Sequence, residues 1–269
     1  MPLHHALLLG LVEGLTELLP VSSTGHLILL DAVLAHEGEA AKTLDIVIQL
    51  GAVLAIALYF RARLTEHARG VLARRPESLR LASALALAFL PAAVVGLALH
   101  RWIKAHLFGP GPVALALALG GVAMLAAERW QRSHPGESGL ERVTWRSGLV
   151  IGLCQCLALW PGASRSMTTI VGGKLCRLDT RTSAEFSFLL ALPTLGAATL
   201  FDLAKNGRLL LELPGGASAL AVGTAVSFVV TWLVLDLFLK HVPRLGLAPF
   251  ALYRLVLAGV VVLLGGHLR

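Results

Sequence analysis

The sequence predicts an all-α integral membrane protein: an inverted-topology repeat with about six transmembrane helices and two re-entrant hairpins of broken helix. Three features predict this fold class, namely the composition, a series of long apolar segments and the similarity of the two halves of the chain. Hydrophobic residues make up 56% of the 269 positions and charged residues only 14%. A soluble domain carries about 25% charged residues, so this composition excludes an ordinary soluble enzyme.

Apolar segments recur along the whole chain, and several approach the length of a membrane-spanning helix. Such a helix needs about 20 residues to cross about 30 Å of hydrocarbon. Each half of the chain is expected to begin with one apolar segment that is interrupted by polar residues. Three membrane-crossing segments are expected to follow it. The predicted spans are 44–60, 81–100, 113–127, 186–201, 219–239 and 255–268.

The two halves of the chain resemble each other at an offset of 141 residues. The stretch LLPVSSTGHLI aligns with LWPGASRSMTT, which pairs Pro20 with Pro161 and Ser23 with Ser164. Because each copy is expected to cross the membrane three times, the second copy is inverted relative to the first. Inverted repeats with broken helices that meet near the midplane are a known membrane architecture.

We interpret the chain as a single polytopic membrane domain built from these two repeats. The first repeat covers 1–127 and the second covers 148–269, and a cytoplasmic linker at 128–147 joins them. No cleavable signal peptide is expected, because the first apolar stretch contains Glu13 and Glu17.

The basic residues indicate the orientation of the chain rather than a nucleic-acid partner. The formal net charge is +7, an excess that would suggest nucleic-acid binding in a soluble protein. However, the loop 61–80 alone carries six Arg and two Glu. Since short cytoplasmic loops are rich in Lys and Arg, we place 61–80, 128–147 and 240–254 in the cytoplasm, the last with Arg254. The C-terminus is then expected outside.

The stretch ELLPVSSTGHLILL, residues 17–30, places hydroxyl groups and a histidine inside an otherwise apolar segment. An ionisable group at membrane depth costs about 2.5–3.5 kcal/mol on insertion scales, so it normally pairs or lines a cavity. Pro20 and Pro161 are each expected to end a half-helix, and the Ser and Thr residues that follow suit the start of the next. The N-terminus of such a half-helix presents free N–H groups and a positive dipole end, which favour phosphate.

The candidate side chains complement each other as two halves of a phosphoryl-transfer site. Glu13 and Glu17 lie four residues apart on one helical face, where they can share a divalent cation or act as a base and its orienting group. Ser23 is a candidate nucleophile that a neighbouring histidine or glutamate could activate, and His26 is close in the sequence. Arg165 offers a planar fork that matches phosphate oxygens. Neutral donors around the phosphate are expected from Ser22, Thr24, Ser164, Ser166 and Thr169.

Each candidate also has a purely structural explanation. Glutamates at helical spacing are commonly a solvated face, a histidine near a helix start can be a cap, and Ser and Thr in membrane helices commonly bond their own backbone. Asp45 and Gln49, again four apart, are interpreted either as polar residues around the site or as packing residues. The structural explanation is weakest for Arg165, because an arginine in an apolar stretch needs a partner.

Two stretches, LVEGLTELLPVSSTGHLIL and WPGASRSMTTIVGG, closely resemble the signature sequences of the undecaprenyl-diphosphate phosphatase family, the BacA-type bacitracin-resistance proteins. The stretches EFSFLLALPTLGA and DIVIQLGAVLAI resemble the same family, so the resemblance covers essentially the full length. The family's E-x-x-x-E motif falls on Glu13 and Glu17. Its S-S-T-G-H motif falls on 22–26 and its P-G-x-S-R-S-x-x-T motif on 161–169, where Met167 replaces the glycine that many members carry.

The resemblance implies a membrane phosphatase that removes the terminal phosphate of undecaprenyl diphosphate and so regenerates the lipid carrier for cell-wall precursors. It also implies dependence on Mg²⁺ or Ca²⁺, a homodimer, and a multi-pass protein of the bacterial inner membrane whose site faces the periplasm. In this interpretation Glu13 and Glu17 hold the cation, Ser23 attacks or positions the attacking water, and His26 moves the proton. The sequence leaves open whether Ser23 forms a phosphoenzyme.

Two other functions use the same residues. Inverted repeats with broken helices could move a prenyl phosphate across the bilayer, instead of hydrolysis or in addition to it. An intramembrane Ser/His protease is disfavoured, because peptide hydrolysis needs neither a carboxylate pair for a metal nor an arginine fork for phosphate.

Overall fold

The computed structural model describes residues 2–34, 38–107, 109–212 and 214–265, and these residues are almost entirely helical. Within these ranges, the only β-type pairing is one isolated bridge between Glu137 and Leu178. The elements of the first half are α1 (Leu3–Thr16), α2 (Ser23–Leu34), α3 (Glu39–Val47), α4 (Gln49–Tyr59), α5 (Arg61–Leu72), α6 (Pro76–His106) and α7 (Pro110–Ser133). Those of the second half are η1 (Leu140–Arg142), α8 (Trp145–Cys156), η2 (Leu157–Leu159), α9 (Arg165–Leu175), α10 (Thr180–Glu212), α11 (Gly216–Leu245) and α12 (Ala248–Gly265).

Among the described residues, five helical segments are long and apolar enough to cross a membrane, which agrees with a multi-pass, all-α membrane protein. They are Glu39–Tyr59, Pro76–Leu99, Pro110–Ser133, Thr180–Glu212 and Gly216–Leu245. These segments contain the first five predicted spans, apart from the last residue of 44–60 and of 81–100. The sixth predicted span falls on α12, whose described apolar part, Ala248–Leu263, belongs to the shorter helices of 10–17 residues.

The prediction that residues 240–254 form a loop is wrong. The predicted cytoplasmic loop 240–254 is largely helical, because α11 continues to Leu245 and α12 begins at Ala248. Arg254 therefore lies inside α12, and it is completely buried rather than exposed in a loop.

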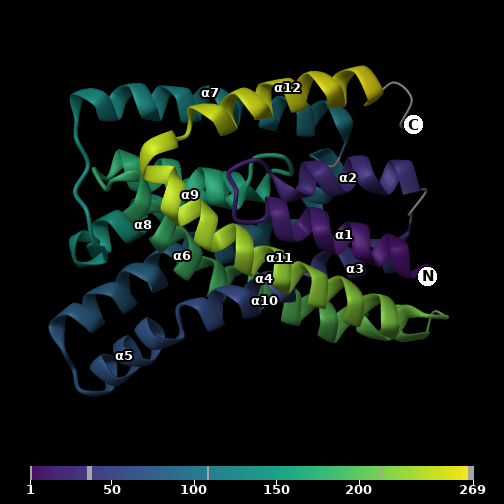
Figure 1. Ribbon diagram of the computed structural model, residues 1–269, viewed down its shortest axis with the longest axis horizontal. Helices are drawn as coiled ribbons and strands as arrows, with labels where there is room; N and C mark the ends of the chain where they lie inside the picture. The colour runs from purple at the N-terminus through teal and green to yellow at the C-terminus, as the bar shows by residue number, and fades with distance from the viewer. Residues whose placement is uncertain (1, 35–37, 108, 213, 266–269) are drawn as a thin grey trace.

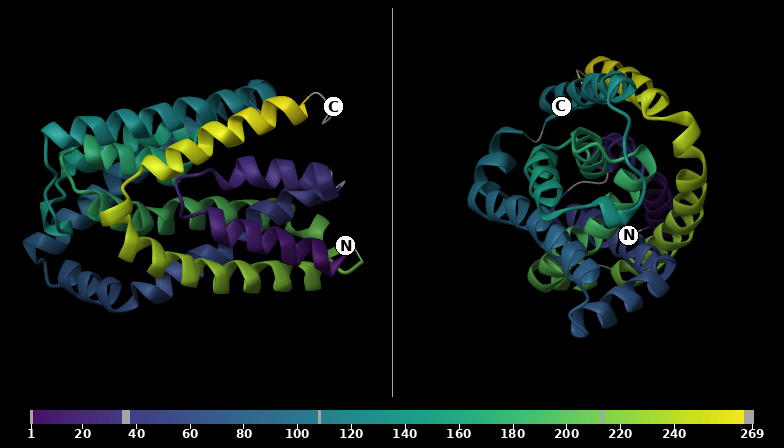
Figure 2. Two further views of the ribbon diagram at one scale, coloured as in Figure 1. Left: turned by 45° about the horizontal axis from the view of Figure 1, so that its top comes forward. Right: turned by 90° about the vertical axis from the view of Figure 1, so that its left-hand side faces the viewer.

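Two short helix pairs are interrupted at the predicted proline positions. The chain leaves α1 at Thr16 and enters α2 at Ser23, and it leaves η2 at Leu159 and enters α9 at Arg165. Both interruptions lie near the centre of the molecule (Figure 1, Figure 2). From there α1 and α2 extend toward the end where the chain begins, whereas α8 and α9 extend toward the opposite end, where α5 also lies.

The residue before each re-entering helix has the same local structure. Ser22 and Ser164 both adopt left-handed backbone conformations, with φ of 75° and 72°, which few residues other than glycine adopt. Each serine caps the following helix through its hydroxyl oxygen, which accepts an N–H from Gly25 or Met167 at 3.2 Å. The structural counterpart of Ser164 is therefore Ser22 rather than Ser23, because the second loop has one residue more after its proline.

Close helix packing fixes the elements around these loops. A Cβ atom at Gly10 would overlap the carbonyl group of Gly223, and one at Gly51 would overlap that of Thr224. Small residues of this kind let membrane helices approach each other closely, so α1 and α4 both pack directly on the backbone of α11. The loop after α1 and the start of α4 are thereby held on a rigid support.

Helix α10 is buried on every side where it passes the centre. Phe186 and Phe188 are completely buried, and Phe188 packs against Phe238 of α11 with ring centroids 5.8 Å apart. The residue between them, Ser187, is also completely buried. A hydroxyl group in such a place needs a hydrogen-bond partner, and it finds one at the site described next.

Candidate active site

A cavity of about 150 Å³ lies where the two interrupted loops meet. The first residues of both α2 and α9 belong to its wall, so the N-termini of two helices meet there. Four of the predicted serine and threonine residues, Glu17 and Arg165 line it too. The complete wall is Glu17, Ser22, Ser23, Thr24, Gln49, Ala158, Trp160, Gly162, Ser164, Arg165 and Leu195.

An ion pair between Glu17 and Arg165 joins the two loops. The Arg165 Nη2 atom lies 3.1 Å from Glu17 Oε1, although the two residues are 148 positions apart in the sequence. Their side chains are only 10% and 5% exposed. The structure thus brings the predicted acidic half and the predicted cationic half of the site into direct contact.

Ser23 donates its hydroxyl proton to the same carboxylate. The Ser23 Oγ atom lies 2.6 Å from Glu17 Oε2, and both residues are buried. Both oxygens of Glu17 are therefore engaged, one by a hydroxyl group and one by a guanidinium group. A nucleophile within hydrogen-bond reach of a base, with the base oriented by a third group, is the arrangement that covalent catalysis requires.

Arg165 is held from its other side by Ser187, a residue that the sequence did not single out. The Arg165 Nη1 atom donates to the Ser187 carbonyl oxygen at 2.9 Å and to its hydroxyl oxygen at 3.2 Å. Thr169 bonds the Ser187 hydroxyl at 2.7 Å and donates to the Arg165 carbonyl at 2.8 Å. Thr169 therefore supports the arginine from behind instead of lining the cavity. The signal for Ser187 was a hydroxyl inside the apolar run EFSFLLALP.

Ser166 ties the second loop to the first. Its hydroxyl donates to the Leu19 carbonyl oxygen at 2.8 Å and lies 3.0 Å from the Ser164 hydroxyl. Ser166 is completely buried, so it is a link between the loops and does not belong to the cavity wall. Ser22, Thr24 and Ser164 do line the cavity, and two of these three are also the helix caps.

Glu13 is completely buried, and neither of its carboxylate oxygens has a hydrogen-bond partner in the described part of the protein. The Glu17, Asp45 and Arg165 side chains are its charged neighbours. An unpartnered buried carboxylate fits a divalent cation. The described residues contain no cluster of three or more His, Cys, Asp or Glu that could hold a metal ion, but Mg²⁺ is commonly bound through one or two carboxylates, substrate phosphates and water. Glu13 and Glu17 therefore fit such an ion.

His26 faces away from this constellation. Its Nδ1 atom lies 2.7 Å from the Ser22 carbonyl oxygen, and its Nε2 atom lies 2.6 Å from the Tyr253 hydroxyl. The His26 and Tyr253 rings also stack, with an interplanar angle of 4°. Both ring nitrogens are therefore engaged, and His26 is not among the residues that line the cavity. The sequence placed His26 beside Ser23, but the partner of Ser23 is Glu17.

Arg254 joins both loops from a third direction. Its guanidinium group donates to the carbonyl oxygens of Pro20 at 3.3 Å and Gly162 at 2.9 Å, and to those of Ala116 and Leu117 in α7. No backbone N–H bonds either loop carbonyl in the described structure. A buried charge is costly unless it is well hydrogen-bonded, and these four hydrogen bonds meet that need for Arg254. Through them, α12 is connected to both loops and to α7.

Comparison with known proteins shows the family to which the chain belongs. Residues 6–260 match the family described as bacitracin resistance protein BacA. The chain belongs to the BacA family. It is 64% identical over 258 residues to an undecaprenyl-diphosphatase of Sorangium cellulosum, which covers 95% of this chain and 84% of that protein. It is 47% identical to undecaprenyl-diphosphatase 2 of Rhodospirillum rubrum, over 96% and 93% of the two chains. Identity to undecaprenyl-diphosphatase 1 of Bacillus cereus is 45%, over 94% of each chain.

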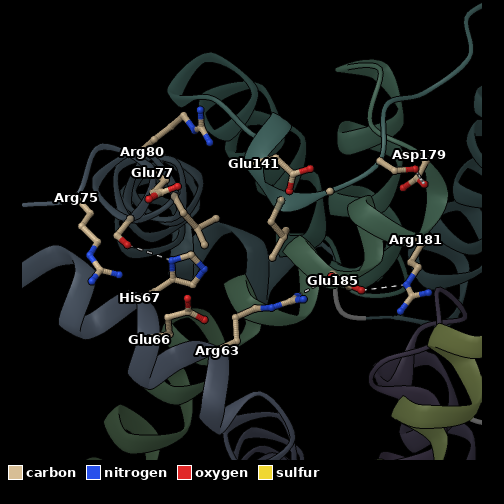
Figure 3. A pocket seen from close by; sticks show the side chains of 15 residues that line it. Arg63, Glu66, His67, Arg75, Glu77, Arg80, Glu141, Asp179, Arg181 and Glu185 are labelled. Carbon is tan, nitrogen blue, oxygen red and sulfur yellow. Dashed lines mark hydrogen bonds and ion pairs between the residues drawn. The ribbon is translucent and has the colours of Figure 1, made fainter.

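This BacA-family chain has a second, larger cavity of about 550 Å³ between α5, the start of α6, the η1 segment and the start of α10 (Figure 3). Figure 3 shows Glu185 between Arg63 and Arg181, to which it is ion-paired at 2.7 and 3.1 Å. Acidic and basic side chains are mixed throughout this wall, where the Ser138 hydroxyl donates to Asp179 at 2.6 Å, but none of the predicted site residues lines this cavity. The smaller cavity is therefore the candidate active site.

We predict that Arg254→Gln destabilises the protein, because the carbonyl groups of Pro20 and Gly162 lose their donor at a cost of about 1–3 kcal/mol each. Thermal unfolding in detergent measures the effect. Arg61→Gln, which changes an exposed arginine at the start of α5, is the matched control and should unfold like the native protein. An unchanged unfolding temperature for Arg254→Gln would show that the loops do not depend on this arginine.

Proposed function

We propose that this chain hydrolyses undecaprenyl diphosphate to undecaprenyl phosphate and inorganic phosphate. The lipid carrier for peptidoglycan synthesis is thereby regenerated, and the cell gains resistance to bacitracin. The observation that carries the proposal is the Glu17 carboxylate, bonded to both Ser23 and Arg165 inside a cavity at two helix N-termini. The names of the similar proteins support the same substrate.

The cavity suits a diphosphate because donors surround it. The N–H groups in the first turn of a helix have no helical partner and attract anions, and α2 and α9 both begin at the wall. Arg165 adds a guanidinium group, and Ser22, Thr24 and Ser164 add hydroxyl groups. In this proposal the diphosphate lies between the loops, and the prenyl chain lies along the apolar surface that faces lipid.

A divalent cation, Mg²⁺ or Ca²⁺, fits the unpartnered Glu13 carboxylate and the adjacent Glu17. When bound, such an ion neutralises the negative charge that develops on phosphate oxygens. The chain's own contribution is to hold two buried carboxylates at the C-terminal end of α1, a helix that packs closely on α11.

In the proposed reaction, the Ser23 oxygen attacks the terminal phosphorus while the Ser23 proton moves to Glu17. The new serine–phosphorus bond forms as the bond between that phosphorus and the bridging oxygen breaks, and undecaprenyl phosphate leaves. Water then attacks the phosphoserine, and the serine–phosphorus bond breaks as Glu17 returns its proton to the Ser23 oxygen. Inorganic phosphate, which keeps the oxygen of the water, and the remaining proton of the water are released. Arg165, which Ser187 holds in place, stabilises the phosphoryl group during both transfers.

For His26 we propose a positioning role in place of the predicted proton transfer. Its bond to the Ser22 carbonyl holds the strained turn that starts α2, and Tyr253 fixes the ring. Proton transfer from Ser23 falls to Glu17, because that carboxylate is the group in contact with the hydroxyl.

We further propose that the two interrupted helix pairs are re-entrant hairpins of an inverted repeat. Supporting observations are the matching caps at Ser22 and Ser164 and the opposite directions in which the pairs extend (Figure 2). The six Arg of 61–80 favour a cytoplasmic position for α5, and we propose that the cavity opens toward the periplasmic side of the inner membrane. A homodimer is part of the same proposal.

Phosphate release from undecaprenyl diphosphate by the purified protein in detergent micelles tests the function. Micelles have no second compartment, so transport alone would give no signal. We predict that Glu17→Gln lowers turnover at least about 100-fold, the scale of losing one charged group at such a site, and that a chelator lowers it too. The matched control is Glu66→Gln, an exposed residue of α5. Activity retained in Glu17→Gln would contradict the proposal.

We also predict a phosphorylated Ser23. Mass analysis of protein trapped with a slowly hydrolysed substrate should show a phosphate adduct on Ser23, and Ser23→Ala should lose it together with turnover. Thr43→Ala, a buried hydroxyl in α3 that bonds its own helix, is the control. Absence of an adduct, with substantial turnover in Ser23→Ala, would indicate direct attack by water.

Two substitutions distinguish a positioning role of His26 from a role in proton transfer. Asparagine places a donor near the position of Nδ1, so His26→Asn should retain most of the turnover while His26→Ala loses it. If both variants were equally inactive yet folded, the proton-transfer role first assigned from the sequence would be supported instead.

A further inference from the structure

We propose that Gln49 is a further substrate-contacting residue, whose side-chain amide donates a hydrogen bond to a phosphate oxygen of the diphosphate. The inference rests on the proposed function and extends it to a residue that neither signature motif contains. Sequence analysis left Gln49 open between a residue around the site and a packing residue. The structure places it in the cavity wall, together with Glu17, Ser23 and Arg165.

The amide of Gln49 is free to bind a ligand. None of the hydrogen bonds found in the described residues involves its side chain, and its polar atoms are not among the buried atoms without a partner. The other two glutamines of the chain differ in this respect. Gln131 donates to the Leu178 carbonyl oxygen at 2.7 Å, and Gln155 donates to that of Ala88 at 3.1 Å. Gln49 is thus the glutamine whose donors remain available at the site.

Several other polar groups of the wall already have protein partners. Glu17 uses its two oxygens on Ser23 and Arg165, and the Ser22 and Ser164 hydroxyls cap helices. The natural partner of the Gln49 amide is therefore a ligand rather than a protein group. An amide also adds two N–H donors without adding charge, which suits a cavity where Arg165 already balances Glu17.

The position of this amide is fixed by the backbone that carries it. Gln49 is the first residue of α4, and only Ile48 separates it from α3. Two residues later, Gly51 packs so tightly on α11 that a Cβ atom would overlap the Thr224 carbonyl group. A ligand group on a rigid element holds its geometry better than one on a loop. Gln49 thus lines the cavity from α4, a helix that belongs to neither of the two interrupted loops.

The test compares Gln49→Glu with the native protein in detergent. Glutamate has the same length but lacks the amide donors and adds a negative charge that repels phosphate. We expect KM for undecaprenyl diphosphate to rise at least tenfold with a smaller change in kcat. The inhibition constant of inorganic diphosphate, used as a competing ligand, should rise by the same factor. Gln49→Leu, which removes the donors without adding charge, should shift both constants in the same direction by less.

The matched control is Gln131→Glu, which removes the hydrogen bond from the Gln131 amide to the Leu178 carbonyl oxygen; Gln131 does not line the cavity. This variant should lower the unfolding temperature and leave KM unchanged, so loss of stability is separated from loss of binding. Constants within twofold of native in both Gln49 variants would overturn the inference. If the native protein released no phosphate, the proposed function would fail; calorimetric binding of inorganic diphosphate that weakens in Gln49→Glu would still support the contact.

Discussion

The ion pair between Glu17 and Arg165 is the interaction on which the centre of this protein depends. Each charge lies in a region that little water reaches, and an unpaired buried charge is strongly destabilising. The two loops must therefore stay together for either charge to be tolerated. Ser166 and Arg254 reinforce that contact through the Leu19, Pro20 and Gly162 carbonyl groups. Backbone polar groups exposed by breaking two helices are in this way satisfied by side chains from elsewhere in the chain.

Breaking the helices in the middle of the molecule has a chemical consequence. An uninterrupted helix satisfies its own N–H groups, whereas each new start leaves N–H groups without a helical partner. Ser22 and Ser164 accept one N–H each and hold the backbone in a left-handed conformation, and the N–H groups nearest the cavity remain for an anion. The interruption itself thus builds an anion site without requiring further cations among the apolar helices.

Two of the polar side chains without a hydrogen-bond partner among the described residues suit different parts of a ligand. Glu13 offers acceptor oxygens suited to a cation, and Gln49 offers donors suited to phosphate. Both come from helices that pack on α11 through glycine, at Gly10 and Gly51. Burying such polar side chains without a partner costs free energy. Their helices nevertheless hold them in place, where a ligand with a metal ion and phosphate oxygens can bind to them.

Composition and local pattern determined the class of fold, the places where helices break and the main residues of the site. They did so because hydrocarbon tolerates few polar groups, so an Arg165 or a Glu17 in an apolar run stands out in the sequence itself. Which groups meet was decided by the tertiary structure. Arg254 was taken for a loop charge, Ser187 was not singled out, and His26 was placed beside Ser23. Local periodicity gives the faces of a helix, but contacts between residues more than a hundred positions apart depend on how the helices cross.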